Sequence, residues 1–124
     1  MAANKVLDLK VFVPAKDFEF SRRFYLDLGF RENWGNKEVC ELEIDGFRFL
    51  LQNFYAKGHA ENFMMSLTVE NADEWWDHIN SSGLLDKYGR HIAKPPALQP
   101  WGLRVLYLTD PTGVLWHIAD QRKS

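Results

Sequence analysis

Hydrophobic and polar residues alternate in several short stretches of the chain, which is the pattern of β-strands with one buried face. In residues 7–13, every second residue from Leu9 to Val13 is apolar, and Lys10 and Phe12 would point to the opposite face. Comparable stretches predict further strands at residues 38–44, 47–53, 63–69, 103–109 and 114–119. Two weaker stretches, 31–36 and 91–94, predict short strands. Asp45-Gly46 is typical of a hairpin turn between 38–44 and 47–53.

Two stretches have the apolar spacing of amphipathic helices, over about residues 17–28 and 72–81. Asp17 and Asn71 stand at their starts, where a side-chain oxygen can accept a hydrogen bond from a free backbone N–H group. Gly29 and Gly83 follow their ends, where glycine is common. Asp17 and Asn71 are 54 residues apart, and so are Gly29 and Gly83. The second half therefore repeats the order of the first.

This order is strand, helix and three strands, twice. We predict a single α+β domain of residues 1–124, built from βαβββ modules at about 5–56 and 61–120 with a linker at 57–60. One helix can cover only one face of each sheet, so the other face stays uncovered. We expect the two uncovered faces to form a curved sheet around a shared cleft.

Composition narrows the class of protein. The chain has 124 residues, 46% of them hydrophobic and 26% charged, which is typical of one globular domain. A net charge of −2 gives no basic surface for nucleic acid or anionic membranes. No apolar leader or membrane span is visible, so we expect a cytoplasmic protein. Cys40 is the single cysteine, which excludes an intrachain disulfide and a cysteine-based zinc site.

Alternation also predicts which side chains line the cleft. They are mostly apolar with a few polar groups, as in small-molecule pockets. Trp101 lies in a Pro-Trp-Gly loop at the expected mouth, where its indole can stack on a planar ligand. His117 can fix the ligand's orientation by hydrogen bonding. The predicted ligand-binding residues are Phe12, Arg48, Leu50, Met64, Ser66, Trp101, Leu115 and His117.

Glu41 and Glu43 are the strongest candidates for acid–base chemistry, because they share one strand face about 6–7 Å apart. No partner for them is evident in the sequence, so we interpret them as a solvated or interface face. Lys10 and Arg48 either pair with these glutamates or recognise an anionic ligand. Motifs for nucleophilic catalysis, phosphate loops and dinucleotide binding are missing from the sequence.

Two segments resemble the vicinal oxygen chelate superfamily. Residues 11–30, VFVPAKDFEFSRRFYLDLGF, are similar to its first strand and helix, with the pattern F-Y-x-x-L-G-F. Residues 100–118, PWGLRVLYLTDPTGVLWHI, are similar to the last two strands of its bleomycin-resistance branch, with the pattern D-P-x-G. The resemblance extends over essentially the whole chain. It implies a homodimer whose clefts are completed across the interface.

Enzymes of this superfamily hold a divalent metal with histidine, glutamine or glutamate side chains from both halves. The resemblance places Lys10, Leu50, Met64 and His117 at the matching positions. Only His117 is a usual ligand of a borderline metal ion. We therefore predict no metal and no cofactor, as in the metal-free bleomycin-resistance branch.

The favoured hypothesis is a metal-independent protein that sequesters a planar, aromatic small molecule in a dimer cleft, as bleomycin resistance proteins do; the sequence does not decide whether antibiotic resistance is its biological role. It has no catalytic residues and no nucleic-acid or membrane partner. One alternative is a metal-dependent enzyme, either a glyoxalase-like lyase or isomerase or a dioxygenase. Another is a structural or regulatory module without a small ligand.

Overall fold

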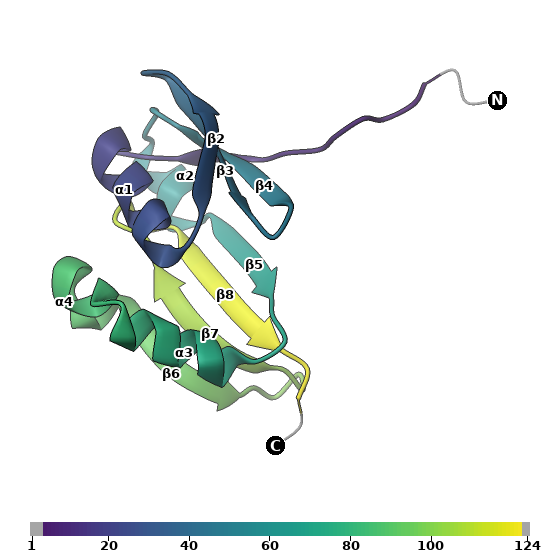
Figure 1. The fold of residues 1–124 in the computed structure, drawn as a ribbon, viewed down its shortest axis with the longest axis vertical. Coiled ribbons are helices and arrows are strands. Elements are labelled where there is room, and N and C mark those ends of the chain that lie inside the picture. Colours follow the sequence, from purple (N-terminus) through teal and green to yellow (C-terminus); the bar gives the residue numbers. More distant parts are fainter. Residues whose placement is uncertain (1–3, 123–124) are drawn as a thin grey trace.

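The computed structural model describes residues 4–122 and contains two four-stranded sheets (Figure 1). The first sheet has the strand order β1-β4-β3-β2, and the second has the order β5-β8-β7-β6. In each sheet only the first pair in this order is parallel. The predicted α+β class with a repeated βαβββ order is confirmed, although the strands form two separate sheets within one chain.

The elements of the first module are β1 (Phe12–Pro14), α1 (Phe18–Leu28), β2 (Arg31–Gly35), β3 (Val39–Ile44) and β4 (Phe47–Gln52). Those that follow are α2 (Lys57–Glu61), β5 (Met64–Thr68), α3 (Ala72–Ser81), α4 (Leu84–Tyr88), the 3-10 turn η1 (Arg90–Ile92), β6 (Ala93–Leu98), β7 (Arg104–Thr109) and β8 (Leu115–Asp120). Within residues 4–122, no helix is long and apolar enough to cross a membrane.

Both predicted helix caps are present. The Asp17 side chain accepts a hydrogen bond from the backbone N–H of Phe20, and the Asn71 side chain accepts one from Glu74. Gly29 ends α1 with a φ of 130°, a conformation that favours glycine. The predicted linker, residues 57–60, lies in the short helix α2 between β4 and β5. The bounds of the strand predicted at 91–94 were wrong, because β6 continues through Pro95-Pro96, which an edge strand tolerates.

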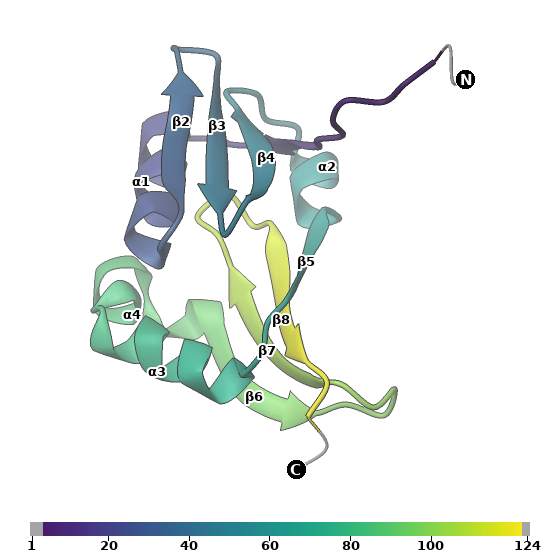
Figure 2. The same ribbon diagram turned by 45° about the vertical axis from the view of Figure 1, so that its right-hand side comes forward.

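The predicted strand over residues 7–13 forms only at Phe12–Pro14, because β4 pairs with these three residues alone. Residues 4–11, which we call the arm, extend away from the body of the protein (Figure 1, Figure 2). Leu7 and Leu9 in the arm are 87% and 90% exposed, whereas Val13 is fully buried. The expectation that Leu9 would be buried with Val13 was therefore wrong, because this part of the chain has no neighbouring strand.

The two modules share one core through their helix-covered faces. The ring of Tyr25 on α1 contacts Phe49 of the first sheet and Trp116 of the second at centroid distances of 5.1 and 5.7 Å. Phe49 and Trp116 also contact each other, at 5.5 Å. The covered faces therefore meet within the chain, and the uncovered faces, which we call the open faces, lie outside this contact.

A buried hydrogen-bond network joins the two segments that carry the family resemblance. The Tyr25 hydroxyl donates to the Asp110 carboxylate at 2.5 Å, and the Trp116 indole N–H donates to Tyr25 at 2.9 Å. The other carboxylate oxygen of Asp110 accepts three backbone N–H groups from residues 112–114. Burial raises the pKa of both Tyr25 and Asp110. This network fixes the Asp-Pro-Thr-Gly turn against α1.

Candidate functional site

Four polar side chains form a line across the open face of the second sheet. The strand register places Ser66 beside His117, His117 beside Tyr107, and Tyr107 beside Lys94. We call these four residues the polar row. Their sequence neighbours Met65, Trp116, Leu108 and Ala93 all pack in or against the core. Because side chains alternate along strands, the polar row must lie on the opposite, open face.

The polar row is bordered by apolar and hydroxyl side chains. Met64, Leu115 and Thr109 form the neighbouring row on one side, and Thr68, Ala119 and Val105 form it on the other. Four predicted ligand-binding residues thus lie together on this face: Met64, Ser66, Leu115 and His117. Sequence reasoning missed Tyr107 and Lys94, although continuing the alternation through residues 103–109 would have indicated Tyr107. The binding role of these residues stays a prediction.

The side chains of the polar row are free of polar partners. Among residues 4–122, the structure shows no hydrogen bond or ion pair to the side chains of Ser66, His117, Tyr107 or Lys94. Tyr107 and His117 contact each other edge to face, with a centroid distance of 4.9 Å. Ser66 and Lys94 are exposed, and the two rings are half-buried. The hydrogen-bonding capacity of this face is therefore available to a ligand.

The open face of the first sheet differs, because its charged side chains neutralise one another. The Lys10 ammonium lies 2.5 Å from a carboxylate oxygen of Glu41 and 2.9 Å from Asp8. The Asn33 amide donates to both Glu41 and Glu43, at 2.9 Å each. The hydrogen bonds from Lys10 and Asn33 hold the pKa of Glu41 below its usual range. The two glutamates therefore have firm partners, and the Lys10–Glu41 pair is one of the two possibilities that the sequence left open.

Two arginines complete this charged network. Arg31 pairs with Glu43 at 2.9 Å, and Arg48 lies 3.5 Å from Asp8. The hydrogen bond from Asn33, with the charges of Arg31 and Arg48, lowers the pKa of Glu43. Of the two interpretations of Lys10 and Arg48, the structure supports pairing with acidic side chains, although Arg48 pairs with Asp8 rather than with a glutamate.

The remaining predicted residues of the first module lie on the same open face. Phe12 is opposite Leu50 in the parallel pair, and Leu50 is opposite Glu41. Phe12 is 51% exposed. Arg48 also lines a cavity of about 280 Å³ together with Ser66 from the second module. This cavity brings together two predicted ligand-binding residues, but Phe12, Leu50, Leu115 and His117 do not line it.

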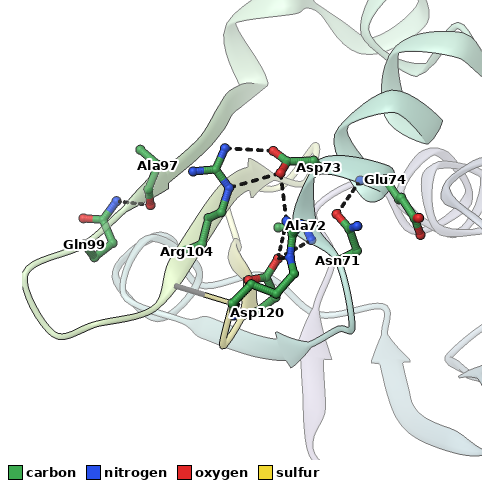
Figure 3. A network of polar contacts seen from close by, with 9 residues as sticks. Asn71, Ala72, Asp73, Glu74, Ala97, Gln99, Arg104 and Asp120 are labelled. Carbon is green, nitrogen blue, oxygen red and sulfur yellow. Dashed lines mark hydrogen bonds and ion pairs between the residues drawn. The ribbon is translucent and has the colours of Figure 1, made fainter. Parts of the chain in front are cut away.

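Trp101 lies in the loop between β6 and β7 and is 59% exposed. The loop is held at its base by Arg104, whose guanidinium donates to Asp73 at 2.9 and 3.2 Å (Figure 3). Tyr107 follows Arg104 by three positions along β7, which corresponds to about 10 Å. Because the polar row runs across the strands, Trp101 lies to one side of the row, beyond the start of β7, and only a ligand longer than this gap can contact both within one chain.

Comparison with known proteins identifies the family. Residues 9–118 match the Glyoxalase/Bleomycin resistance protein/Dioxygenase superfamily. The chain belongs to this superfamily. No curated protein matches the sequence.

Solved structures of the superfamily share the fold at low sequence identity. A bleomycin-binding protein solved in complex with bleomycin is 20% identical, with a TM-score of 0.76 over 94% of this chain and 100% of that one. A bleomycin resistance determinant encoded on transposon Tn5 is 22% identical, with a TM-score of 0.77 over 94% and 99%. Lactoylglutathione lyase from Agrobacterium tumefaciens is 13% identical, with a TM-score of 0.67 over 94% and 96%. At these identities the likeness shows the fold alone.

The side chains that the family resemblance places at the metal-binding positions are poorly suited to bind a divalent metal. The ammonium group of Lys10 is ion-paired with two carboxylates, and Leu50 has no donor atom. Met64 offers a thioether that suits soft metal ions, which leaves His117 as the one usual ligand. Within residues 4–122, no three His, Cys, Asp or Glu side chains gather as a metal-binding group. The donor set does not fit a divalent metal, so we derive no metal-dependent step.

Proposed function

We propose that this protein is a metal-independent small-molecule-binding protein that holds a flat aromatic ligand against the open face of the second sheet. The polar row carries this proposal, because its four side chains are accessible and have no polar partner among residues 4–122. Apolar side chains beside it, such as Leu115 and Met64, provide surface for a ring system. The structural likeness to a bleomycin-binding protein supports this class of function.

In this proposal the ligand is sequestered, not transformed. Ser66 and His117 fix its orientation by hydrogen bonding, and the edges of Tyr107 and His117 contact its rings. We assign no catalytic residue. A cytoplasmic protein of this kind confers antibiotic resistance by lowering the free concentration of a toxic compound.

The homodimer is part of the same proposal. Three apolar side chains of the arm are 78–90% exposed: Val6, Leu7 and Leu9. Neighbouring exposed apolar side chains of this kind are unusual on a protein that stays monomeric. β1 and β5 are edge strands, so an extended arm from a second copy can add to an open edge. Because the covered faces meet within one chain, a second copy is needed to place a first open face across the whole polar row. The first sheet of one copy would then face the polar row of the other.

Titration of the purified protein with bleomycin and with 2-naphthamide, a small flat neutral probe, tests the binding function. We expect saturable quenching of tryptophan fluorescence by at least one of them, and about tenfold weaker binding in His117→Ala. His59→Ala, which changes an exposed histidine on α2, is the matched control and should bind normally. Failure of both probes to bind would contradict the proposal, as would equal binding by wild type and His117→Ala.

Sedimentation equilibrium tests the dimer separately. We expect a mass of twice 14.5 kDa for the wild type at micromolar concentration. The variant Leu7→Gln/Leu9→Gln should shift to the monomer, because it removes apolar surface from the arm. Lys5→Gln changes the arm without removing apolar surface and should remain dimeric. A monomeric wild type would overturn the dimer.

A further inference from the structure

The open face of the second sheet carries charge of one sign. Its three central rows contain no aspartate or glutamate among the described residues. They comprise Met64, Leu115 and Thr109; Ser66, His117, Tyr107 and Lys94; and Thr68, Ala119, Val105 and Ala97. Lys94 supplies the positive charge, and its exposed ammonium group has no carboxylate partner within residues 4–122.

The other three members of the polar row can all donate hydrogen bonds. Serine and tyrosine donate through their hydroxyl groups, and a histidine ring donates through at least one N–H group. Strands lie about 4.8 Å apart, so the row from Ser66 to Lys94 spans about 14 Å. A ligand lying along the row would therefore meet hydrogen-bond donors throughout, with a fixed positive charge at one end.

The acidic side chains near the polar row have other contacts and do not pair with Lys94. Asp110 and Asp120 follow β7 and end β8, and both are buried. Asp110 binds Tyr25 and the following turn, while Asp120 accepts from the backbone N–H of Ala72 at 2.6 Å. Glu70 lies beyond the end of β5 and lines a different cavity, beside Glu74 and Trp75. These carboxylates therefore do not compensate Lys94.

Lysine and arginine side chains of the first open face cannot take the same role. Lys10 is held by Asp8 and Glu41, Arg31 by Glu43, and Arg48 by Asp8. An incoming anion would have to compete with these carboxylates. Among the described residues of the two open faces, Lys94 is thus the cation that is free to bind an anion.

We propose that the ligand of the polar row is an aromatic acid, whose carboxylate pairs with Lys94 while its ring system lies over Tyr107 and His117. This inference rests on the proposed binding function and adds a ligand class to it. An ammonium–carboxylate pair with hydrogen bonds from neighbouring donors is the usual way in which such a group is recognised. The ring edges of Tyr107 and His117 favour contact with a flat π-system.

The test compares 2-naphthoate with 2-naphthamide, which have the same shape but differ in charge. By isothermal titration calorimetry at pH 7.5 and low salt, we expect wild type to bind 2-naphthoate at least tenfold more tightly. Lys94→Gln should lower the affinity for 2-naphthoate to that for 2-naphthamide and leave the latter unchanged. Lys37→Gln, which changes an exposed lysine between β2 and β3, is the matched control and should behave as wild type.

Several outcomes would overturn the inference. If wild type binds the two probes equally, or prefers the amide, the ligand class is wrong while the binding function stands. If Lys94→Gln weakens the binding of both probes equally, Lys94 does not distinguish the charged probe from the neutral one. If neither naphthalene probe binds while bleomycin does, the ligand class is wrong and the binding function stands; if bleomycin does not bind either, both fail. Should Lys94→Gln not fold, the salt dependence of wild-type binding provides the second measurement. Raising the salt concentration from 20 to 500 mM must weaken the binding of 2-naphthoate alone.

Discussion

The open faces of the two sheets occupy equivalent positions in a repeated architecture, yet their polar groups are used differently. On the first sheet, Lys10, Glu41 and Asn33 belong to a network in which each charge meets a partner. On the second, Tyr107 and Lys94 have no polar partner among the described residues. A self-compensated face contributes to stability, and an uncompensated face offers its interactions to a ligand. The comparison therefore distinguishes a face whose charges compensate one another from the face that we propose binds the ligand.

The largest expected effect is on stability. Glu41→Ala removes hydrogen bonds from Lys10 and Asn33 on a side chain that is nearly buried, and we expect a loss of about 2 kcal/mol in the free energy of unfolding. Tyr107→Phe, on the binding face, should change it by less than about 0.5 kcal/mol. Urea unfolding followed by circular dichroism measures both. Equal losses in the two variants would remove the distinction between the faces.

The next effect concerns a long ligand. If bleomycin binds, Trp101→Ala should weaken it about tenfold, because a lost stacking contact is worth roughly 0.5–1.5 kcal/mol and 1.4 kcal/mol is one decade. Phe20→Ala is the matched control, since Phe20 is an aromatic side chain on α1 that is 45% exposed and lies on neither open face. It should change the affinity less than twofold. Calorimetry is suitable because Trp101→Ala alters tryptophan fluorescence. A greater loss in Phe20→Ala than in Trp101→Ala would contradict the assigned role of Trp101.

A smaller effect is expected in how much stability the protein loses at acidic pH. The folded pKa values of Asp8, Glu41 and Glu43 are lowered, so these carboxylates stabilise the fold above their unfolded pKa values. That contribution is lost as the pH falls through the folded values, below about pH 4. The variant Glu43→Gln should therefore lose less stability than wild type between pH 6 and pH 3. Parallel loss in both proteins, measured by thermal unfolding at each pH, would contradict this.

The smallest expected effect is that of metal ions. With Lys10, Leu50 and Met64 at the family's ligand positions, we expect no stoichiometric zinc, nickel, manganese or iron in the purified protein. Adding these ions after treatment with EDTA should shift the melting temperature by less than about 1 °C, since tight binding to the folded state would raise it. Elemental analysis and a thermal scan provide the measurements. A bound ion at His117 would favour the metal-dependent enzyme instead.

Local chemistry made much of the fold predictable from the sequence. Asp17 and Asn71 cap α1 and α3, and Asp45-Gly46 turns β3 into β4 with positive φ at both residues. These signals depend on residues close in sequence. Alternation also separated open from covered positions, as for His117 and Trp116.

What could not be predicted depends on contacts between distant residues. Alternation in residues 7–13 does not reveal whether a neighbouring strand exists, so the exposed arm was missed. The row that joins Lys94 to Tyr107 and His117 requires the strand register. Likewise, no local signal shows that Glu41 meets Lys10, because the pair connects the arm to β3.

The hydrogen bond between Tyr25 and Asp110 has a consequence for the order of synthesis. The two residues are 85 positions apart, so α1 is translated long before its buried partner exists. At 5–20 residues per second, the delay is about 4–17 s. During this interval the aromatic side of α1 lacks both Asp110 and Trp116. The aromatic side of α1 therefore cannot complete its native contacts until the chain has been synthesised as far as Trp116.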